Sequence, residues 1–143
     1  MPNAAAKYSS EYLTADQMAS ALKQLPAVLL GIFGECWFTT YYGWATNIHE
    51  DLQYKTMRVR TDRMQRFIED SVEQRIVVPG ESDLFLESPE KEIELLFCHE
   101  SDIHVDGDSL ERMQQFMNAE PYKEFHWSSQ SEIAAQIERD RQQ

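Results

Sequence analysis

Two short segments with alternating apolar residues, 84–87 and 92–98, flank a Ser-Pro-Glu-Lys sequence. Alternation with a period of two is typical of a strand with one buried face, and a serine followed by proline is typical of a turn. The pattern therefore predicts a β-hairpin whose second arm buries Ile93, Leu95 and Phe97. The opposite face of that arm is expected to carry Glu92, Glu94, Leu96 and Cys98.

Other parts of the chain have the 3.6-residue period of amphipathic helices. Thr14 and Gln17 form a capping box at the start of the first one, and Pro26 is expected to end it. Asp108 is expected to cap the third helix, with Glu111 as its capping-box partner. The four predicted helices lie near 15–25, 62–75, 109–118 and 131–140.

The apolar segment 27–44 has two interpretations. Its aromatic and β-branched residues favour a hairpin with arms at 28–33 and 36–42. A buried helix with Pro26 in its first turn is the alternative. Weaker strand patterns occur at 54–60, 76–78 and 103–105.

The arrangement of these elements predicts an α+β fold, in which about four helices flank a small, mainly antiparallel sheet. A length of 143 residues favours a single domain spanning 1–143. Residues 1–10 carry no periodic pattern and are expected to be frayed.

Charge is distributed very unevenly along the chain. Residues 1–60 carry five acidic and five basic side chains, so the formal net charge of −12 arises entirely after residue 60. The segment 81–111 contains eleven carboxylates and a single lysine, Lys91. Such a surface attracts basic protein surfaces and repels nucleic acid and anionic membranes. We therefore expect no direct binding to nucleic acid.

The histidines and cysteines do not match a known catalytic or metal-binding motif. The segment 102–108 resembles part of a calcium loop, but His104 stands at its third position and Met113 at its twelfth. Along one extended strand, His99 points away from the other potential ligands. The remaining ones, Cys98, Glu100, Asp102 and His104, share a face but span roughly 20 Å, too long for one metal site without a bend. The sequence therefore predicts no metal, no cofactor and no catalytic residue.

The two cysteines, Cys36 and Cys98, lie far apart without metal-ligand spacing, which favours reduced thiols in a cytoplasmic protein. The start of the chain lacks the apolar segment of a secretory signal. The apolar run 27–43 is short for a membrane span and contains Glu35, so we expect it in the protein core rather than in a membrane.

We expect a binding protein that docks on, and inhibits, a basic partner, as immunity proteins against toxins and nucleic-acid mimics do. The alternative is a small enzyme or ligand-binding domain with an aromatic pocket around Glu35, Trp37, Tyr41 and Trp44. The sequence is compatible with a homo-oligomer, and it favours a protein without enzymatic activity. The expected partner-binding residues are Glu81, Asp83, Glu87, Glu90, Glu92, Glu94, Glu100, Asp102, Asp106 and Asp108.

Overall fold

The computed structural model describes residues 7–142 and confirms the predicted α+β fold. Its helices are α1 (Ala15–Phe33), α2 (Met64–Glu73), α3 (Leu110–Met117) and α4 (Gln130–Arg141). Its strands are β1 (Tyr8–Ser10), β2 (Trp37–Tyr42), β3 (Met57–Arg60), β4 (Leu84–Glu87), β5 (Glu94–Phe97), β6 (Ile103–Asp106) and β7 (Trp127–Ser129). Four short 3-10 turns are η1 (Glu50–Leu52), η2 (Thr61–Arg63), η3 (Pro89–Lys91) and η4 (Tyr122–Glu124).

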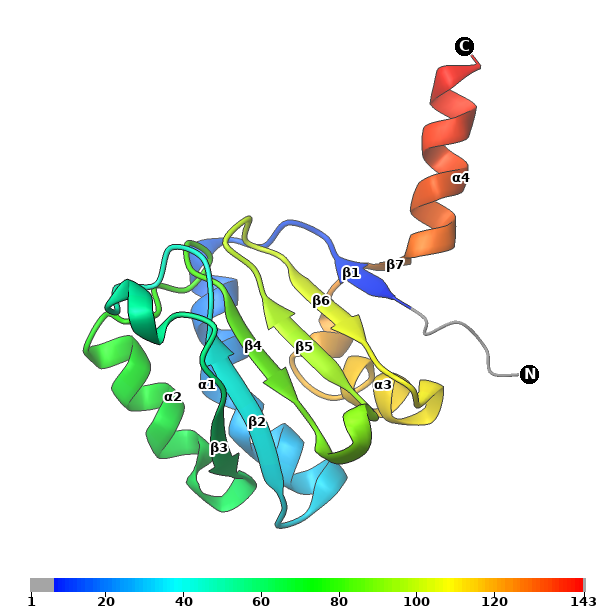
Figure 1. The fold of residues 1–143 in the computed structure, drawn as a ribbon. Coiled ribbons are helices and arrows are strands. Elements are labelled where there is room, and N and C mark those ends of the chain that lie inside the picture. The colour runs from blue at the N-terminus through cyan, green and yellow to red at the C-terminus, as the bar shows by residue number, and fades with distance from the viewer. Residues whose placement is uncertain (1–6, 143) are drawn as a thin grey trace.

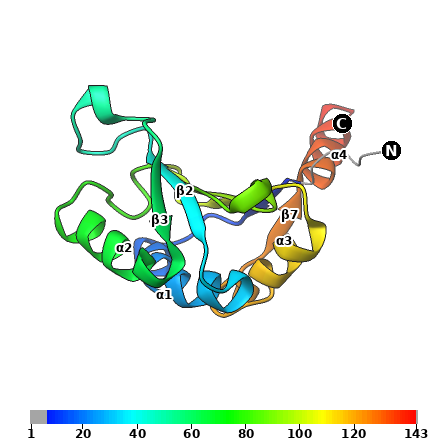
Figure 2. The same ribbon diagram turned by 60° about the horizontal axis from the view of Figure 1, so that its bottom comes forward.

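The seven strands form one antiparallel sheet in the order β3-β2-β4-β5-β6-β1-β7. Helices α1, α2 and α3 cover one face of this sheet (Figure 1). The loop that contains η1 and helix α4 both rise on the other side, over which residues 7–142 place no helical layer (Figure 2). We call this uncovered side the open face.

The predicted hairpin is confirmed as β4 and β5, joined through η3. Its register pairs Leu84 with Phe97 and Glu87 with Glu94. The leucines of β4 and the alternate residues Leu95 and Phe97 are buried beneath the helices, as their period of two predicts.

The segment 27–44 combines both sequence interpretations, because α1 continues through Phe33 and β2 follows it. The prediction that Pro26 ends the helix is wrong. Pro26 and Leu29 are buried in the core, and this burial offsets the hydrogen bond that proline cannot donate. The helix ends instead at Phe33 and is capped by Gly34, whose positive φ of 68° suits glycine.

Three smaller predictions also need correction. Residues 8–10 are not frayed but form β1, which pairs with β6 and β7; the predicted fraying of 1–6 lies outside the described residues. The segment 76–78 is not a strand: Ile76 and Val77 both donate backbone hydrogen bonds to Ser71 in the turn after α2. The third helix is capped by Ser109, one residue later than predicted.

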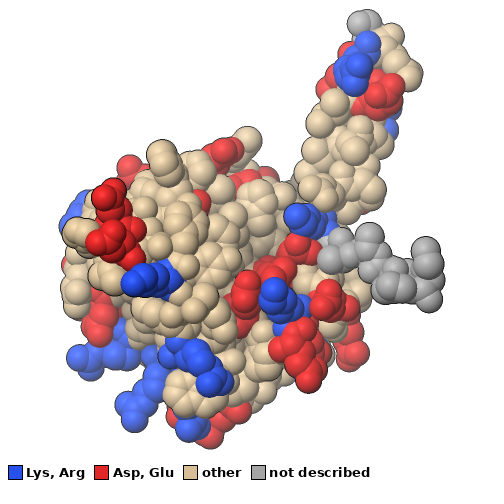
Figure 3. Space-filling model, viewed as in Figure 1, with Lys and Arg blue, Asp and Glu red and all other residues tan. Residues whose placement is uncertain are grey.

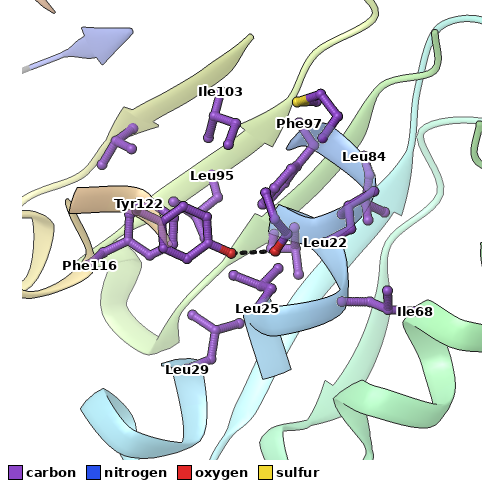
Figure 4. Close-up of a cluster of buried hydrophobic side chains, with 14 of the residues drawn as sticks. Leu22, Leu25, Leu29, Ile68, Leu84, Leu95, Phe97, Ile103, Phe116 and Tyr122 are labelled. Carbon is purple, nitrogen blue, oxygen red and sulfur yellow. Dashed lines mark hydrogen bonds between the residues drawn. The ribbon is translucent and has the colours of Figure 1, made fainter. Parts of the chain in front are cut away.

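The core lies between the sheet and the three covering helices (Figure 4). Tyr122 is fully buried, stacks on Phe116 with 4.2 Å between ring centroids, and donates a 2.6 Å hydrogen bond to the Ala21 carbonyl. This contact ties the segment after α3 to α1 and brings β7 to the edge of the sheet. Among residues 7–142, none of the helices has the length and apolar character needed to cross a membrane.

Candidate functional site

The strand register places an apolar row of side chains across the middle of the open face. Tyr41 lies opposite Phe85, and Phe85 lies opposite Leu96. The rings of Tyr41 and Phe85 stack with 4.5 Å between centroids, and Tyr54 from the η1 loop approaches both. Partly exposed apolar side chains in a concave surface commonly mark a binding site.

A row of three carboxylates runs beside the apolar row. Glu87 of β4 lies directly opposite Glu94 of β5, and Glu94 lies directly opposite Asp106 of β6. We call these residues the acidic triad. Burial raises the pKa of Glu94, and the negative charges of Glu87 and Asp106 raise it further. Like charges directly opposite one another destabilise a sheet, so the triad has a cost in stability.

Replacement of Glu94 by glutamine should therefore stabilise the fold at pH 7, by a few tenths to about 1 kcal/mol. Because folding raises the pKa of Glu94, the wild-type protein loses this share of its stability as the pH rises through that pKa. The gain in the variant should fade below the ordinary glutamate value of 4.5.

Urea unfolding of wild type, Glu94→Gln and Glu73→Gln at pH 7 and at pH 4 measures this difference. Glu73 is an exposed acid on α2, far from the triad, and serves as the matched control. A gain that is the same at both pH values would contradict the repulsion within the triad.

A concave pocket of about 410 Å³ joins the apolar row to the acidic triad. Ile133 of α4 also lines this pocket, and Lys7 forms a 3.6 Å ion pair with Asp106 at its margin. All side chains of α4 are exposed, including Ile133 at 38% and Ile137 at 55%. The helix thus extends the apolar lining of the pocket beyond the sheet.

Charge is segregated on the open face (Figure 3). Acidic side chains gather over the ends of β4, β5 and β6, whereas basic side chains gather beside β3. Arg58 and Arg60 place their guanidinium groups over the ring of Trp37, at 5.1 and 5.8 Å from its centroid. Arg60 is also paired with Glu35 and Asp62, so much of its charge is already compensated within the chain.

A second polar group lies where β5 turns into β6. It contains Asp83, Cys98, His99, Asp102 and His104, and we call it the hairpin-end cluster. The Nδ1 atom of His99 lies 2.8 Å from Asp83 Oδ1 and 3.8 Å from Cys98 Sγ. The Nε2 atom of His104 lies 3.2 Å from Asp102 Oδ1.

These contacts shift the pKa values of the cluster. Burial raises the pKa of Cys98 to about 12, and the nearby carboxylates of Asp102 and Asp83 act in the same direction. Burial opposes ionisation of Asp102, but the hydrogen bond to His104, the charge of His104 and a hydrogen bond from Cys98 together outweigh it and lower the pKa of Asp102. The hydrogen bond between Asp102 and His104 also raises the pKa of His104. A thiol with so high a pKa is a weak nucleophile at neutral pH.

The ten predicted partner-binding residues do not form one surface. Asp83 and Asp102 are 6% and 8% exposed and contact histidines, so little of either carboxylate is accessible to a partner. The alternation of residues in the sequence could not reveal this burial, because it depends on how the end of the β5–β6 hairpin folds. Glu87, Glu94 and Asp106 form the triad. Glu90 in η3 and Glu92 and Asp108 in loops lie near the same ends of the strands, whereas Glu81 and Glu100 lie in turns elsewhere.

The predicted aromatic pocket around Glu35 is not assembled as a unit. Tyr41 lines the open-face pocket, whereas Trp37 lies under the arginines of β3 and Trp44 lies beside His99. Glu35 is exposed and paired with Arg60. Phe85 and Leu96 were not predicted as site residues, although their alternation with buried leucines places both on the solvent side.

Comparisons of the chain with protein-family models, with curated proteins and with solved structures found no match.

Proposed function

We propose that this chain is a cytosolic binding protein that holds a basic protein partner on the open face of its sheet. The observation that carries the proposal is the acidic triad, aligned across three adjacent strands beside a concave apolar row. Two unpaired thiols, Cys36 and Cys98, support the cytosolic setting.

The triad suits an arginine or lysine side chain. A positive group placed among Glu87, Glu94 and Asp106 would relieve their mutual repulsion on binding. The aliphatic stem of the same side chain can lie along an apolar surface, which the neighbouring Phe85 and Leu96 provide. The site thus combines charge with apolar contact.

The overall charge favours the same class of partner. A net charge of −12 speeds encounter with a positively charged protein and disfavours nucleic acid. Basic surfaces of this kind occur on toxins that act on nucleic acid and on other nucleic-acid-binding proteins. An inhibitory role, like that of an immunity protein or a nucleic-acid mimic, follows if the open face covers the working surface of such a partner.

The proposal is tested with a short synthetic peptide that alternates arginine and leucine, added to isotopically labelled protein. We expect shifts of backbone amide signals to concentrate on β4, β5 and β6. The triple variant Glu87→Gln/Glu94→Gln/Asp106→Asn should bind this peptide about tenfold more weakly or worse. Added salt should weaken wild-type binding, because exposed charges are screened over about 10 Å at 0.1 M.

The matched control is the triple variant Glu69→Gln/Glu73→Gln/Glu111→Gln, which removes the same charge from helices on the covered side. It should bind the peptide almost as the wild type does. Equal losses in the two triple variants would show that only net charge matters. That result, or the absence of localised shifts, would contradict a site on the open face.

A further inference from the structure

We propose that Cys98, Asp102 and His104 bind a zinc-like transition-metal ion at the end of the β5–β6 hairpin. Their sulfur, oxygen and nitrogen atoms all lie within 4.8 Å of one another. Thiolate, carboxylate and imidazole are the three ligand types that zinc uses in proteins. The acidic triad supplies none of these ligands. His104 also lines the open-face pocket, but the metal-binding test below does not depend on partner binding.

The turn of the hairpin makes this arrangement possible. Cys98 follows β5 and Asp102 precedes β6, and the Cys98 N–H donates a 2.9 Å hydrogen bond to the Asp102 carbonyl. The chain reverses between them, with Ser101 at a positive φ of 63°. Two residues that would be far apart along one extended strand are therefore neighbours across the hairpin, and His104 lies on the same face as Asp102.

One distance in the cluster is close to that of a tetrahedral metal site, and the other pairs of ligand atoms lie within 4.8 Å. With bonds of about 2.3 Å to sulfur and about 2.0–2.2 Å to nitrogen and oxygen, tetrahedral ligand atoms lie about 3.3–3.6 Å apart. The separation of 3.2 Å between His104 Nε2 and Asp102 Oδ1 is near this range. Small side-chain rotations would bring the Cys98 sulfur to the same ion.

Neighbouring groups are placed to orient the ligands. The hydroxyl of Ser9 lies 3.3 Å from His104 Nδ1, so it can accept the Nδ1–H and leave Nε2 free for a metal. Asp83 Oδ1 lies 2.8 Å from His99 Nδ1, which is closer than two ligands of one tetrahedral ion would lie. We therefore assign Asp83 and His99 to the outer shell, beside the Cys98 sulfur. The fourth position on the ion is then left to water.

The charge of the cluster also suits a divalent cation. Asp83 and Asp102 are both buried, and their ion-pair partners within residues 7–142 are histidines rather than lysine or arginine. The side chains of His99 and His104 are 36% and 42% exposed. Two buried carboxylates therefore form the inner wall of the cluster. The partly exposed histidines lie on its solvent side, from which an ion can enter.

The test uses full-length, tag-free protein that has been stripped of metal with a chelator. Titration with Zn²⁺ should show one ion bound per chain, with release of protons as the thiol ionises. Titration with Co²⁺ should give a near-ultraviolet band of thiolate-to-metal charge transfer. Mg²⁺ and Ca²⁺, which prefer oxygen ligands, should not compete.

Substitutions separate the proposed ligands from their surroundings. Cys98→Ser should abolish the charge-transfer band, whereas Cys36→Ser, which removes the other thiol, should leave it unchanged. His104→Ala should weaken Zn²⁺ binding by more than the roughly 10–100-fold expected for loss of an outer-shell partner, and Ser9→Ala should weaken it by about 10-fold. His126→Ala, at an exposed histidine outside the cluster, should have no effect.

Circular dichroism of each variant checks that the fold is retained, and Asp102→Asn supplies a conservative substitution if Cys98→Ser does not fold. Weak binding of several zinc ions that is unaffected by Cys98→Ser or Asp102→Asn would show adventitious surface binding and overturn the proposal. Loss of binding in Asp83→Asn but not in Asp102→Asn would place the ion between Asp83, Cys98 and His99, and would also overturn it.

Discussion

Replacement of Gly107 by alanine should lower the free energy of unfolding by about 2–4 kcal/mol. Gly107 has a φ of 139°, a conformation that residues with a Cβ rarely adopt. An added Cβ would overlap the Glu92 carbonyl and lie 2.8 Å from Ile93 Cα, where the backbone cannot easily yield. The substitution should also displace the neighbouring Asp106 and so weaken peptide binding at the triad.

Denaturant unfolding measures this loss, with Gly31→Ala as the matched control. Gly31 lies inside α1, and an added Cβ there meets no atom within 4 Å. Alanine favours a helix over glycine, so this control should gain about 0.5–1 kcal/mol. A Gly107→Ala variant as stable as wild type would mean that the turn at the start of the β6–α3 loop tolerates a side chain.

The parts of the fold that were predicted well are those with strong local patterns. The Thr14 capping box, the 84–97 hairpin and its buried leucines follow from side chains within a few residues of one another. The register that pairs Glu87 with Glu94 was not predicted from the sequence and comes from the structure. That pairing supplies two of the three carboxylates of the acidic triad.

The parts that were missed depend on contacts between distant segments. Strand β1 has three residues and no apolar period; it forms because β6 and β7 both pair with it. The continuation of α1 past Pro26 depends on burial of Leu29 against the sheet and the other helices. Neither cause is visible in the local sequence.

The candidate sites show the same limit. No metal cluster was predicted at 98–104, because the potential ligands would be too far apart along a single extended strand. The reversal between Cys98 and Asp102 removes that objection, and Asp83 reaches His99 from another strand end. The third member of the triad, Asp106, depends on the pairing of β5 with β6, which the sequence left uncertain.

Among single substitutions, reversal of charge at the centre of the triad should have the largest effect on binding. Glu94→Lys should weaken binding of the arginine–leucine peptide by about 30-fold or more, equivalent to at least about 2 kcal/mol. The same substitution should stabilise the free protein, because the lysine would face Glu87 and Asp106 across the sheet.

Peptide titration and urea unfolding of the same preparations measure both effects. Glu73→Lys on α2 makes the same change of net charge away from the open face. It should change neither the affinity for the peptide nor the free energy of unfolding strongly. Gain of stability with loss of binding would identify the triad as a surface kept for binding at a cost in stability. A Glu94→Lys variant that binds the peptide as wild type does would refute this role.

The most direct test of a basic partner on the open face is an exchange of charge between protein and peptide. Wild type and the variant Glu87→Lys/Glu94→Lys/Asp106→Lys are each titrated with the arginine–leucine peptide and with a glutamate–leucine peptide of equal length. Wild type should prefer the arginine peptide, and the variant should prefer the glutamate peptide. If both proteins prefer the same peptide, or neither binds either one, the open face is not the binding site proposed here.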